Sequence, residues 1–273
     1  MSLTLLLVGC GKMGGALLDG WLAAGSVARV VVVEPNDFGA TAGHAGAGHE
    51  RVLRCAGADA LPSRFNPDVV VFAVKPQVLG GVVPDYRRFV GPGTVFLSIA
   101  AGKPIGWFEQ QLAPAAAVVR AMPNTPAAVG RGITVACANK AVSEAQRDAC
   151  EMLLRAVGDV AWIEDEALID PVTAVSGSGP AYVFLLIEAL AAAGVKAGLP
   201  EELAMRLARA TVAGSGELAH RSIEPAATLR RNVTSPGGTT EAALKVLMAD
   251  NGLQPLFDCA IVAATRRARE LAG

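Results

Sequence analysis

The sequence predicts two parts, an α/β domain with a doubly wound parallel sheet in residues 1–163 and an all-α domain in residues 164–273. Short runs rich in β-branched residues alternate with helix-like segments in the first part, an order that implies right-handed crossovers between parallel strands. After about residue 166, long Ala- and Leu-rich stretches broken by Gly and Pro replace the strand-like runs. A length of 273 residues is sufficient for two such domains.

The composition excludes several classes of protein. With 52% hydrophobic and 18% charged residues, the chain is too apolar for intrinsic disorder. Lys+Arg at 24 against Asp+Glu at 25 gives a net charge of −1, which does not favour nucleic-acid binding. The richest apolar stretch, residues 181–195, contains Glu188 and falls short of the roughly 20 apolar residues of a membrane span. The five cysteines lack a CxxC pair and the start of the chain lacks a basic segment, so we expect a cytoplasmic protein with reduced thiols and no metal site.

Individual elements can be placed along the chain. The expected strands of the first domain are residues 3–8, 30–33, 68–74, 94–99, 118–122, 133–137 and 160–163. The first is a continuous apolar run, as expected for a strand covered on both faces. The helix that follows it should end at Gly25, a residue suited to a left-handed C-terminal cap. Ser143 and Gln146 have the spacing of a capping box, and Pro200 followed by two Glu residues should begin a helix of the second domain.

The segment after the first strand, residues 9–14, reads GCGKMG and fits the pattern G-x-G-x-x-G. In this pattern Gly9 permits a tight turn, Gly11 lets the backbone approach a pyrophosphate, and Gly14 lets helix and strand pack closely. A strand before the loop, a helix after it and Glu34 about 20 residues further on complete the context of a Rossmann-like dinucleotide-binding domain. Glycines that serve only a tight turn are the alternative interpretation.

Glu34 bears on the choice between NADH and NADPH. A carboxylate at the end of the second strand accepts hydrogen bonds from ribose hydroxyls and repels a 2′-phosphate. The residues directly after Glu34 supply no arginine. We therefore expect NADH or NADPH as cofactor, with NADH slightly favoured, although a solvated Glu34 would leave the choice open.

Four further segments are not explained by a generic dinucleotide-binding fold. They are AVKPQ (73–77), RAMPNTP (120–126), VSGSGPAY (175–182) and NVTSPGGTT (232–240). In this order, together with the glycine loop, they closely resemble the pyrroline-5-carboxylate reductase family, from Leu5 to about Arg269. The resemblance implies reduction of (S)-1-pyrroline-5-carboxylate to L-proline by hydride transfer from NAD(P)H, the final step of proline biosynthesis. It also implies a helical dimerisation domain and a homo-oligomer, either a dimer or a ring of five dimers.

The resemblance assigns roles to residues as well. The expected cofactor-binding residues are Val8, Gly9, Cys10, Gly11, Lys12, Met13 and Gly14 at the pyrophosphate, Glu34 and Asn36 at the adenosine, Ala73, Val74, Lys75, Pro76, Ile99, Ala100 and Ala101 at the nicotinamide half, and Asn232. Glu166 and Asn232 would lie where cofactor and substrate meet. One segment departs from the family pattern, because residues 58–62 (ADALP) lack an Asn that contacts the cofactor in some members.

The last segment has the chemistry of an anion-binding loop. The groups available to hold a substrate carboxylate are the Ser235 hydroxyl and the backbone N–H groups of Gly237, Gly238 and Thr239. The candidate catalytic residues are Thr240, which would bond and orient the ring nitrogen, and Glu166, which would stabilise the charge of the protonated imine. These functional roles have structural alternatives. The loop could be a plain turn with an N-cap, and Glu166 could be a solvated carboxylate.

Other functions fit parts of the sequence. A reductase of another cyclic imine or a β-hydroxyacid dehydrogenase would belong to the same broad class. The dehydrogenase needs a Lys followed by Asn on a long helix, and the nearest candidate, Lys196, lacks the Asn. A non-catalytic dinucleotide sensor would keep the glycine loop and have no use for residues 235–240.

Overall fold

The computed structural model describes residues 3–36, 46 and 48–272. The chain forms two compact units, one of residues 1–177 with 264–273 and the other of residues 178–263. The expected boundary at residues 163/164 marks the end of the sheet. The helical unit begins later because the intervening turns belong to the first unit, where the Asn124 side-chain amide donates to the Ser176 carbonyl at 3.2 Å.

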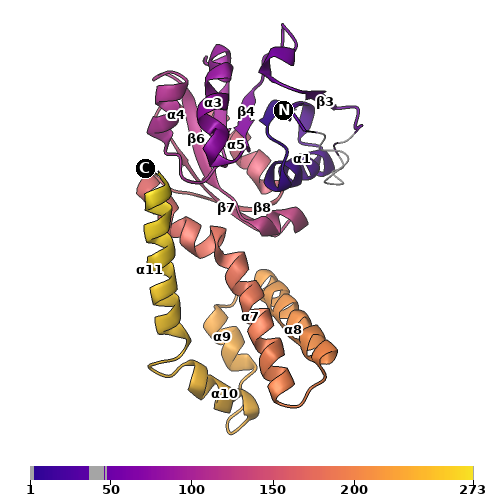
Figure 1. Cartoon of the computed structure of the whole chain (residues 1–273), viewed down its shortest axis with the longest axis vertical. Helices are drawn as coiled ribbons and strands as arrows, with labels where there is room; N and C mark the ends of the chain where they lie inside the picture. The colour runs from indigo at the N-terminus through magenta and orange to yellow at the C-terminus, as the bar shows by residue number, and fades with distance from the viewer. Residues whose placement is uncertain (1–2, 37–45, 47, 273) are drawn as a thin grey trace. The chain divides into compact units, whose positions relative to one another are not determined.

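An eight-stranded sheet with the order β3-β2-β1-β4-β5-β6-β7-β8 forms the centre of the first unit (Figure 1). Its strands are β1 (Leu3–Val8), β2 (Val27–Val33), β3 (Val52–Cys55), β4 (Val69–Phe72), β5 (Val95–Ser98), β6 (Ala117–Met122), β7 (Gly132–Ala138) and β8 (Gly158–Trp162). The seven expected strands are confirmed, and β3 is an addition. The parallel arrangement holds from β3 to β6, whereas β7 runs antiparallel to β6. Only a 3-10 turn, η4 (Thr125–Val129), joins these two strands, and a parallel pair needs a longer crossover.

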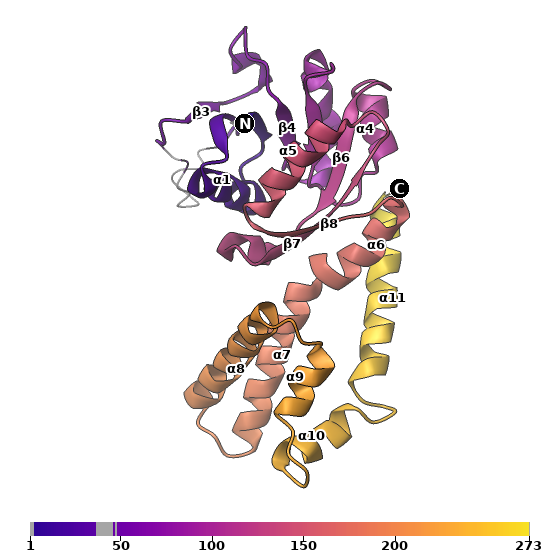
Figure 2. The same cartoon turned by 180° about the vertical axis from the view of Figure 1, so that it is seen from behind.

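Helices cover both faces of the sheet. One face packs against α1 (Lys12–Ala24) and α5 (Glu144–Arg155), which lie in front of the strands in Figure 2. The other face packs against α3 (Leu79–Val82), the 3-10 segment η3 (Val83–Phe89) and α4 (Ile105–Gln111). Alternate residues of β1 serve the two faces, with Leu5 and Leu7 on the first and Leu6 and Val8 on the second. Burial on both sides explains the unbroken apolar run of this strand.

The expected helix ends are present. Gly25 ends α1 with a left-handed φ of 64°, and Ser143 and Gln146 form a reciprocal capping box at the start of α5. The indole N–H of Trp21 on α1 donates to the Leu153 carbonyl on α5 at 2.8 Å. The helices on this face are thereby held to each other as well as to the sheet.

The second unit is helical. It contains α7 (Gly179–Lys196), α8 (Glu201–Arg221), α9 (Ala226–Asn232), α10 (Thr239–Leu247) and the first part of α11 (Leu253–Ala272). Before it stand the 3-10 turn η5 (Glu166–Leu168), α6 (Ile169–Val172) and a π-turn over Thr173–Gly177. Helices α7 and α8 pack as a hairpin, with Pro200 as the N-cap of α8.

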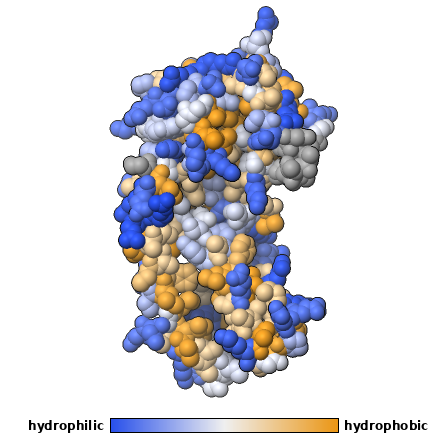
Figure 3. All heavy atoms as spheres, viewed as in Figure 1, coloured by the Kyte–Doolittle hydropathy of each residue, from blue (hydrophilic) through white to orange (hydrophobic). Residues whose placement is uncertain are grey.

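Much of the apolar surface of the second unit is uncovered in a single chain (Figure 3). The continuous helical run Glu166–Lys196 contains an 18-residue window with a mean hydropathy of 1.6 and is long and apolar enough to cross a membrane by length and composition alone. The sequence-based expectation, which considered only unbroken apolar runs, missed this length because the run is interrupted by Asp170 and Glu188. Its exposed apolar residues include Phe184, Leu185 and Leu186, a surface of the kind that marks a protein–protein interface.

Candidate functional site

A cavity of about 530 Å³ lies at the carboxyl ends of β1, β2 and β4 in the first unit. The expected cofactor residues that line it are Val8, Gly9, Gly11, Glu34, Asn36, Ala73, Val74 and Lys75. This edge, where the strand order reverses around β1, is where parallel α/β sheets bind their ligands. The sequence did not predict the remaining wall, which comprises Val33, Pro35, Ala56, Gly57, Ala58, Val78, Val82, Asp85 and Tyr86.

The three glycines of the loop differ in their surroundings. Gly9 has a φ of 90°, and a Cβ there would lie 2.6 Å from the Val74 side chain. A Cβ on Gly14 would lie 2.5 Å from the Gly9 carbonyl oxygen. A Cβ on Gly11 would meet no described atom within 4 Å, and Gly11 lines the cavity. A tight turn accounts for Gly9 and the close packing of α1 accounts for Gly14, whereas the open backbone at Gly11 is the feature that a bound pyrophosphate requires.

The Glu34 carboxylate contacts the glycine loop. Its Oε2 accepts from the Cys10 N–H at 2.9 Å, and its Oε1 accepts from the Asn36 backbone N–H at 3.2 Å and from the Asn36 side-chain amide at 3.3 Å. A carboxylate oxygen on a loop amide shows that this loop accommodates an oxyanion. The loop, the start of α1 and the cavity therefore fit a dinucleotide.

Cys10 is buried beneath the loop. Its pKa is raised to about 12, first by burial and then by the nearby charges of Glu34 and Asp19. The thiol is thus protonated through the neutral range and is a poor nucleophile.

The remaining expected cofactor residues of this unit do not line the cavity. They are Cys10, Lys12, Met13 and Gly14 in the loop and α1, Pro76 at the start of the turn after β4, and Ile99, Ala100 and Ala101 after β5. Ile99 and Ala100 are 9% and 5% exposed. The Ala100 N–H donates to the Ser98 hydroxyl at 3.3 Å, so this segment is a tightly held turn.

Glu166 belongs to a polar cluster in the first unit. Its Oε1 accepts from Arg120 Nη1 at 2.9 Å and from the Ile105 N–H, at the start of α4, at 2.8 Å. The Arg120 side chain is 6% exposed and that of Glu166 is 28% exposed. The carboxylate thus connects β6, α4 and η5, and Arg120 offsets its charge. An arginine inside the apolar strand VVRAM was the available signal for this pair, because buried charges require partners.

The loop Ser235–Thr240 lies in the second unit, at the start of α10. Gly237 has a φ of 72°, and its N–H donates to Glu241 Oε2 at 2.7 Å. Gly238 is the N-cap of α10 and Thr239 is its first residue. One of the amides expected to bind the substrate carboxylate is therefore already hydrogen-bonded to a carboxylate of the protein. Asn232, at the end of α9, donates through its side-chain amide to Glu224 Oε2 at 3.2 Å.

The parallel sheet, the glycine loop and the acid at the end of β2 define the class: a dinucleotide-binding protein of the Rossmann type. Residues 4–102 match the family described as NADP oxidoreductase, coenzyme F420-dependent, and residues 166–271 match pyrroline-5-carboxylate reductase dimerisation. The pyrroline-5-carboxylate reductase of Pseudomonas aeruginosa is 42% identical, over 97% of this chain and 95% of its own length. That of Arabidopsis thaliana is 37% identical, over 97% and 94% respectively.

Solved structures give the same relationship. A pyrroline-5-carboxylate reductase from Coxiella burnetii has a TM-score of 0.90 at 35% identity and covers 100% of both chains. The pyrroline carboxylate reductase of Plasmodium falciparum, solved with NADP bound, has a TM-score of 0.81 at 30% identity, covering 99% of this chain and 98% of its own. The chain belongs to the pyrroline-5-carboxylate reductase family.

Proposed function

We propose that the protein reduces (S)-1-pyrroline-5-carboxylate to L-proline with NADH or NADPH, the last step of proline biosynthesis. The observation that carries this proposal is the Ser235–Thr240 loop at the start of α10, with an amide already bound to a carboxylate. It occurs in a chain that also has a dinucleotide-type cavity. A non-catalytic sensor would need the cavity alone.

The reaction requires little chemistry from the protein itself. The reduced nicotinamide supplies the hydride, and the protein must hold the C=N carbon against it. The Ser235 hydroxyl and the amides of Gly237, Gly238 and Thr239 hold the substrate carboxylate. At Gly237 the substrate takes the place of the Glu241 carboxylate. The Thr240 hydroxyl holds the ring nitrogen, and Asn232 lies beside the cofactor.

In this proposal Glu166 contributes to the reaction mainly by positioning another segment of the protein. The sequence predicts electrostatic stabilisation of the protonated imine by its carboxylate. Arg120 offsets that charge at 2.9 Å, so the remaining contribution is to fix the start of α4 through the Ile105 N–H. The segment Ile99–Ala101, expected at the nicotinamide, directly precedes that helix start.

Glu34 makes NADH the slightly favoured cofactor in this proposal, since its carboxylate lies on the cavity wall where the adenosine ribose is expected. The NADP bound to the Plasmodium falciparum relative supports use of NADPH as well. We also propose a cytoplasmic location, consistent with five free cysteines.

Replacing Thr240 with alanine should lower kcat about tenfold or more with either cofactor, because one oriented hydrogen bond is worth about 1.5–3 kcal/mol. The measurement is a spectrophotometric assay of pyrroline-5-carboxylate with NADH and NADPH side by side. Thr239→Ala is the control, since Thr239 is expected to contribute its backbone N–H. Unchanged turnover of Thr240→Ala would remove this residue from the mechanism, and wild-type protein inactive with both cofactors would contradict the function itself.

The protein should form at least a dimer, which we propose can associate further into a ring of five dimers. The exposed apolar residues of α7, including Phe184 and Leu185, would be covered by the second copy, as the matched dimerisation family implies. Light scattering coupled to size-exclusion chromatography measures this directly. An active monomer would contradict it.

A further inference from the structure

We propose that Arg54 binds the 2′-phosphate of NADPH and so allows this protein to use both cofactors despite Glu34. The proposal deepens the proposed function, since it concerns the cofactor of that reaction. In this proposal Arg54 determines cofactor specificity. The sequence directly after Glu34 gives no sign of it, because Arg54 lies on a different strand.

Strand pairing brings Arg54 to the adenosine end of the cavity. In the register of β2 and β3, Arg54 lies opposite Val32 and Cys55 lies opposite Val33, the residue before Glu34. The carboxyl ends of these parallel strands therefore meet at the edge that forms the cavity wall, where Ala56 and Gly57 follow β3. Arg54 is the charged residue closest to the end of this short strand.

A chain of direct contacts links the Arg54 guanidinium to Glu34. Arg54 Nη2 donates to the Asn36 carbonyl at 2.6 Å. The backbone N–H and side-chain amide of Asn36 donate to Glu34 Oε1 at 3.2 and 3.3 Å. Asn36 and Glu34 both line the cavity. Asn36, two positions after Glu34, therefore connects the guanidinium to the carboxylate that marks the expected position of the ribose.

The chemistry of the guanidinium suits a phosphate at this point. Arginine has five N–H donors in a planar fork that matches phosphate oxygens, and its charge is permanent. A 2′-phosphate extends outward from a ribose whose hydroxyls face Glu34. Repulsion from Glu34, and from Asp85 on the same cavity wall, requires a compensating cation, which Arg54 provides.

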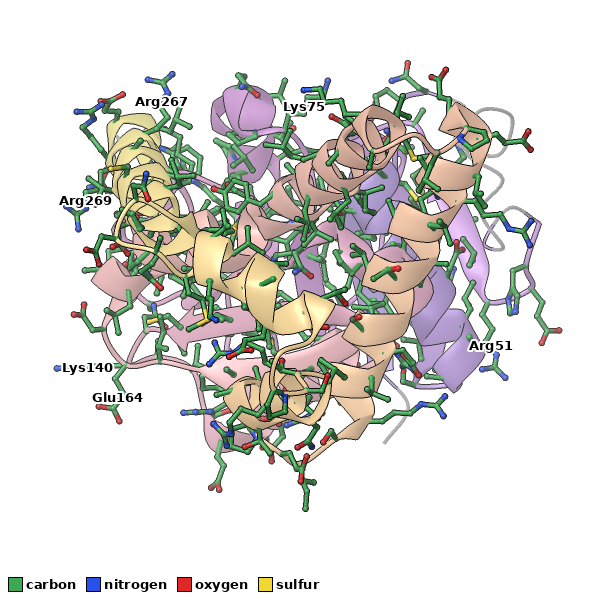
Figure 4. All side chains as sticks on the ribbon, turned by 90° about the horizontal axis from the view of Figure 1, so that it is seen from below. Arg51, Lys75, Lys140, Glu164, Arg267 and Arg269 are labelled. Carbon is green, nitrogen blue, oxygen red and sulfur yellow. The ribbon has the colours of Figure 1, made fainter. Side chains whose placement is uncertain are left out.

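Other cations near the cavity differ from Arg54 in position. Lys75 lines the cavity after β4, where it would contact parts shared by both cofactors. Arg88 donates to the Ala58 carbonyl at 3.1 Å and lies over the Phe89 ring, which makes it the competing candidate. Arg51, at the opposite end of the β3 segment, donates to the Val27 carbonyl at 3.3 Å and extends outward from the unit, on a different side from Lys75 (Figure 4). Arg51 is therefore a matched control for loss of one positive charge.

The test measures binding of adenosine 2′,5′-bisphosphate and of 5′-AMP, which differ only by the 2′-phosphate, by titration calorimetry. Wild-type protein should bind the two nucleotides with similar affinity, because Arg54 offsets the repulsion between Glu34 and the 2′-phosphate. Arg54→Gln should weaken bisphosphate binding about tenfold or more and leave 5′-AMP binding within about twofold. Arg51→Gln and Arg88→Gln should leave the ratio of the two affinities unchanged. Arg54→Lys, which keeps the charge but loses the fork, should give an intermediate value.

Several outcomes would overturn the proposal. Wild-type protein that binds 5′-AMP more than about tenfold more tightly than the bisphosphate, an Arg54→Gln variant that loses both nucleotides to the same extent or neither, or a selective loss of bisphosphate binding in Arg88→Gln would each do so. Unchanged melting temperatures show that the variants are folded. If Arg54→Gln does not fold, the comparison passes to Arg54→Lys, which must then bind the bisphosphate more weakly than wild type and 5′-AMP equally well. Because nucleotide binding is read without the substrate, its result is independent of whether the protein reduces pyrroline-5-carboxylate.

Discussion

Replacing Gly14 with alanine is expected both to destabilise the protein and to abolish measurable dinucleotide binding. The new Cβ would lie 2.5 Å from the Gly9 carbonyl oxygen and 3.1 Å from the Ala73 Cβ. The first neighbour is backbone and cannot rotate away, so the glycine loop must move. Overpacking of this kind costs about 1–3 kcal/mol, which corresponds to a fall in melting temperature of roughly 3–10 °C for a chain of this size. Thermal unfolding and quenching of tryptophan fluorescence by NADH measure the two effects.

Gly11→Ala is the matched variant in the same loop. No described atom lies within 4 Å of a Cβ built on Gly11, so the melting temperature should stay that of the wild type. The methyl group would occupy the side from which the pyrophosphate approaches, and NADH affinity should fall about tenfold or more. Gly11→Ala protein that binds NADH like the wild type would show that these glycines serve only the turn.

Replacing Arg120 with methionine should lower the free energy of unfolding by about 2–4 kcal/mol. Breaking a buried ion pair costs about 3–5 kcal/mol because one charge is left without a partner, and the 28% exposure of the Glu166 side chain reduces that cost. Loss of the pair also frees the carboxylate that holds the start of α4. Urea denaturation followed by circular dichroism measures the change.

The partner variant separates a positioning role for Glu166 from a purely electrostatic one. Glu166→Gln keeps an acceptor for the Ile105 N–H but leaves Arg120 without a counter-charge, so it should also destabilise the protein. The double variant Arg120→Met, Glu166→Gln should lose less stability than the sum of the two single variants. A Glu166→Gln protein of unchanged stability whose kcat has fallen sharply would favour the electrostatic role instead. Arg155→Gln, which removes an exposed pair with Glu151, is a control expected to change stability by less than about 1 kcal/mol.

Local patterns were sufficient for most of the first unit. The expected strands, the Gly25 cap and the Ser143 capping box depend on residues close together in the chain, and the structure contains them. Strand β3 was missed because four residues that include an arginine, VLRC, have neither the length nor the alternation of a recognisable strand. The cavity wall at residues 56–58 and the contact between Arg54 and Asn36 were missed as well, because both depend on this strand.

The sequence by itself determined the class of fold, the dinucleotide loop and the family, because each of these is encoded in short runs whose spacing has a direct physical meaning. Only the tertiary structure decided what the charged side chains do. Arg120 and Glu166 are 46 residues apart in the chain, and Arg54 is 18 residues from Asn36. A charge takes its role from its nearest partner in space. That partner is set by sheet register and crossover connections, which cannot be read from sequence spacing.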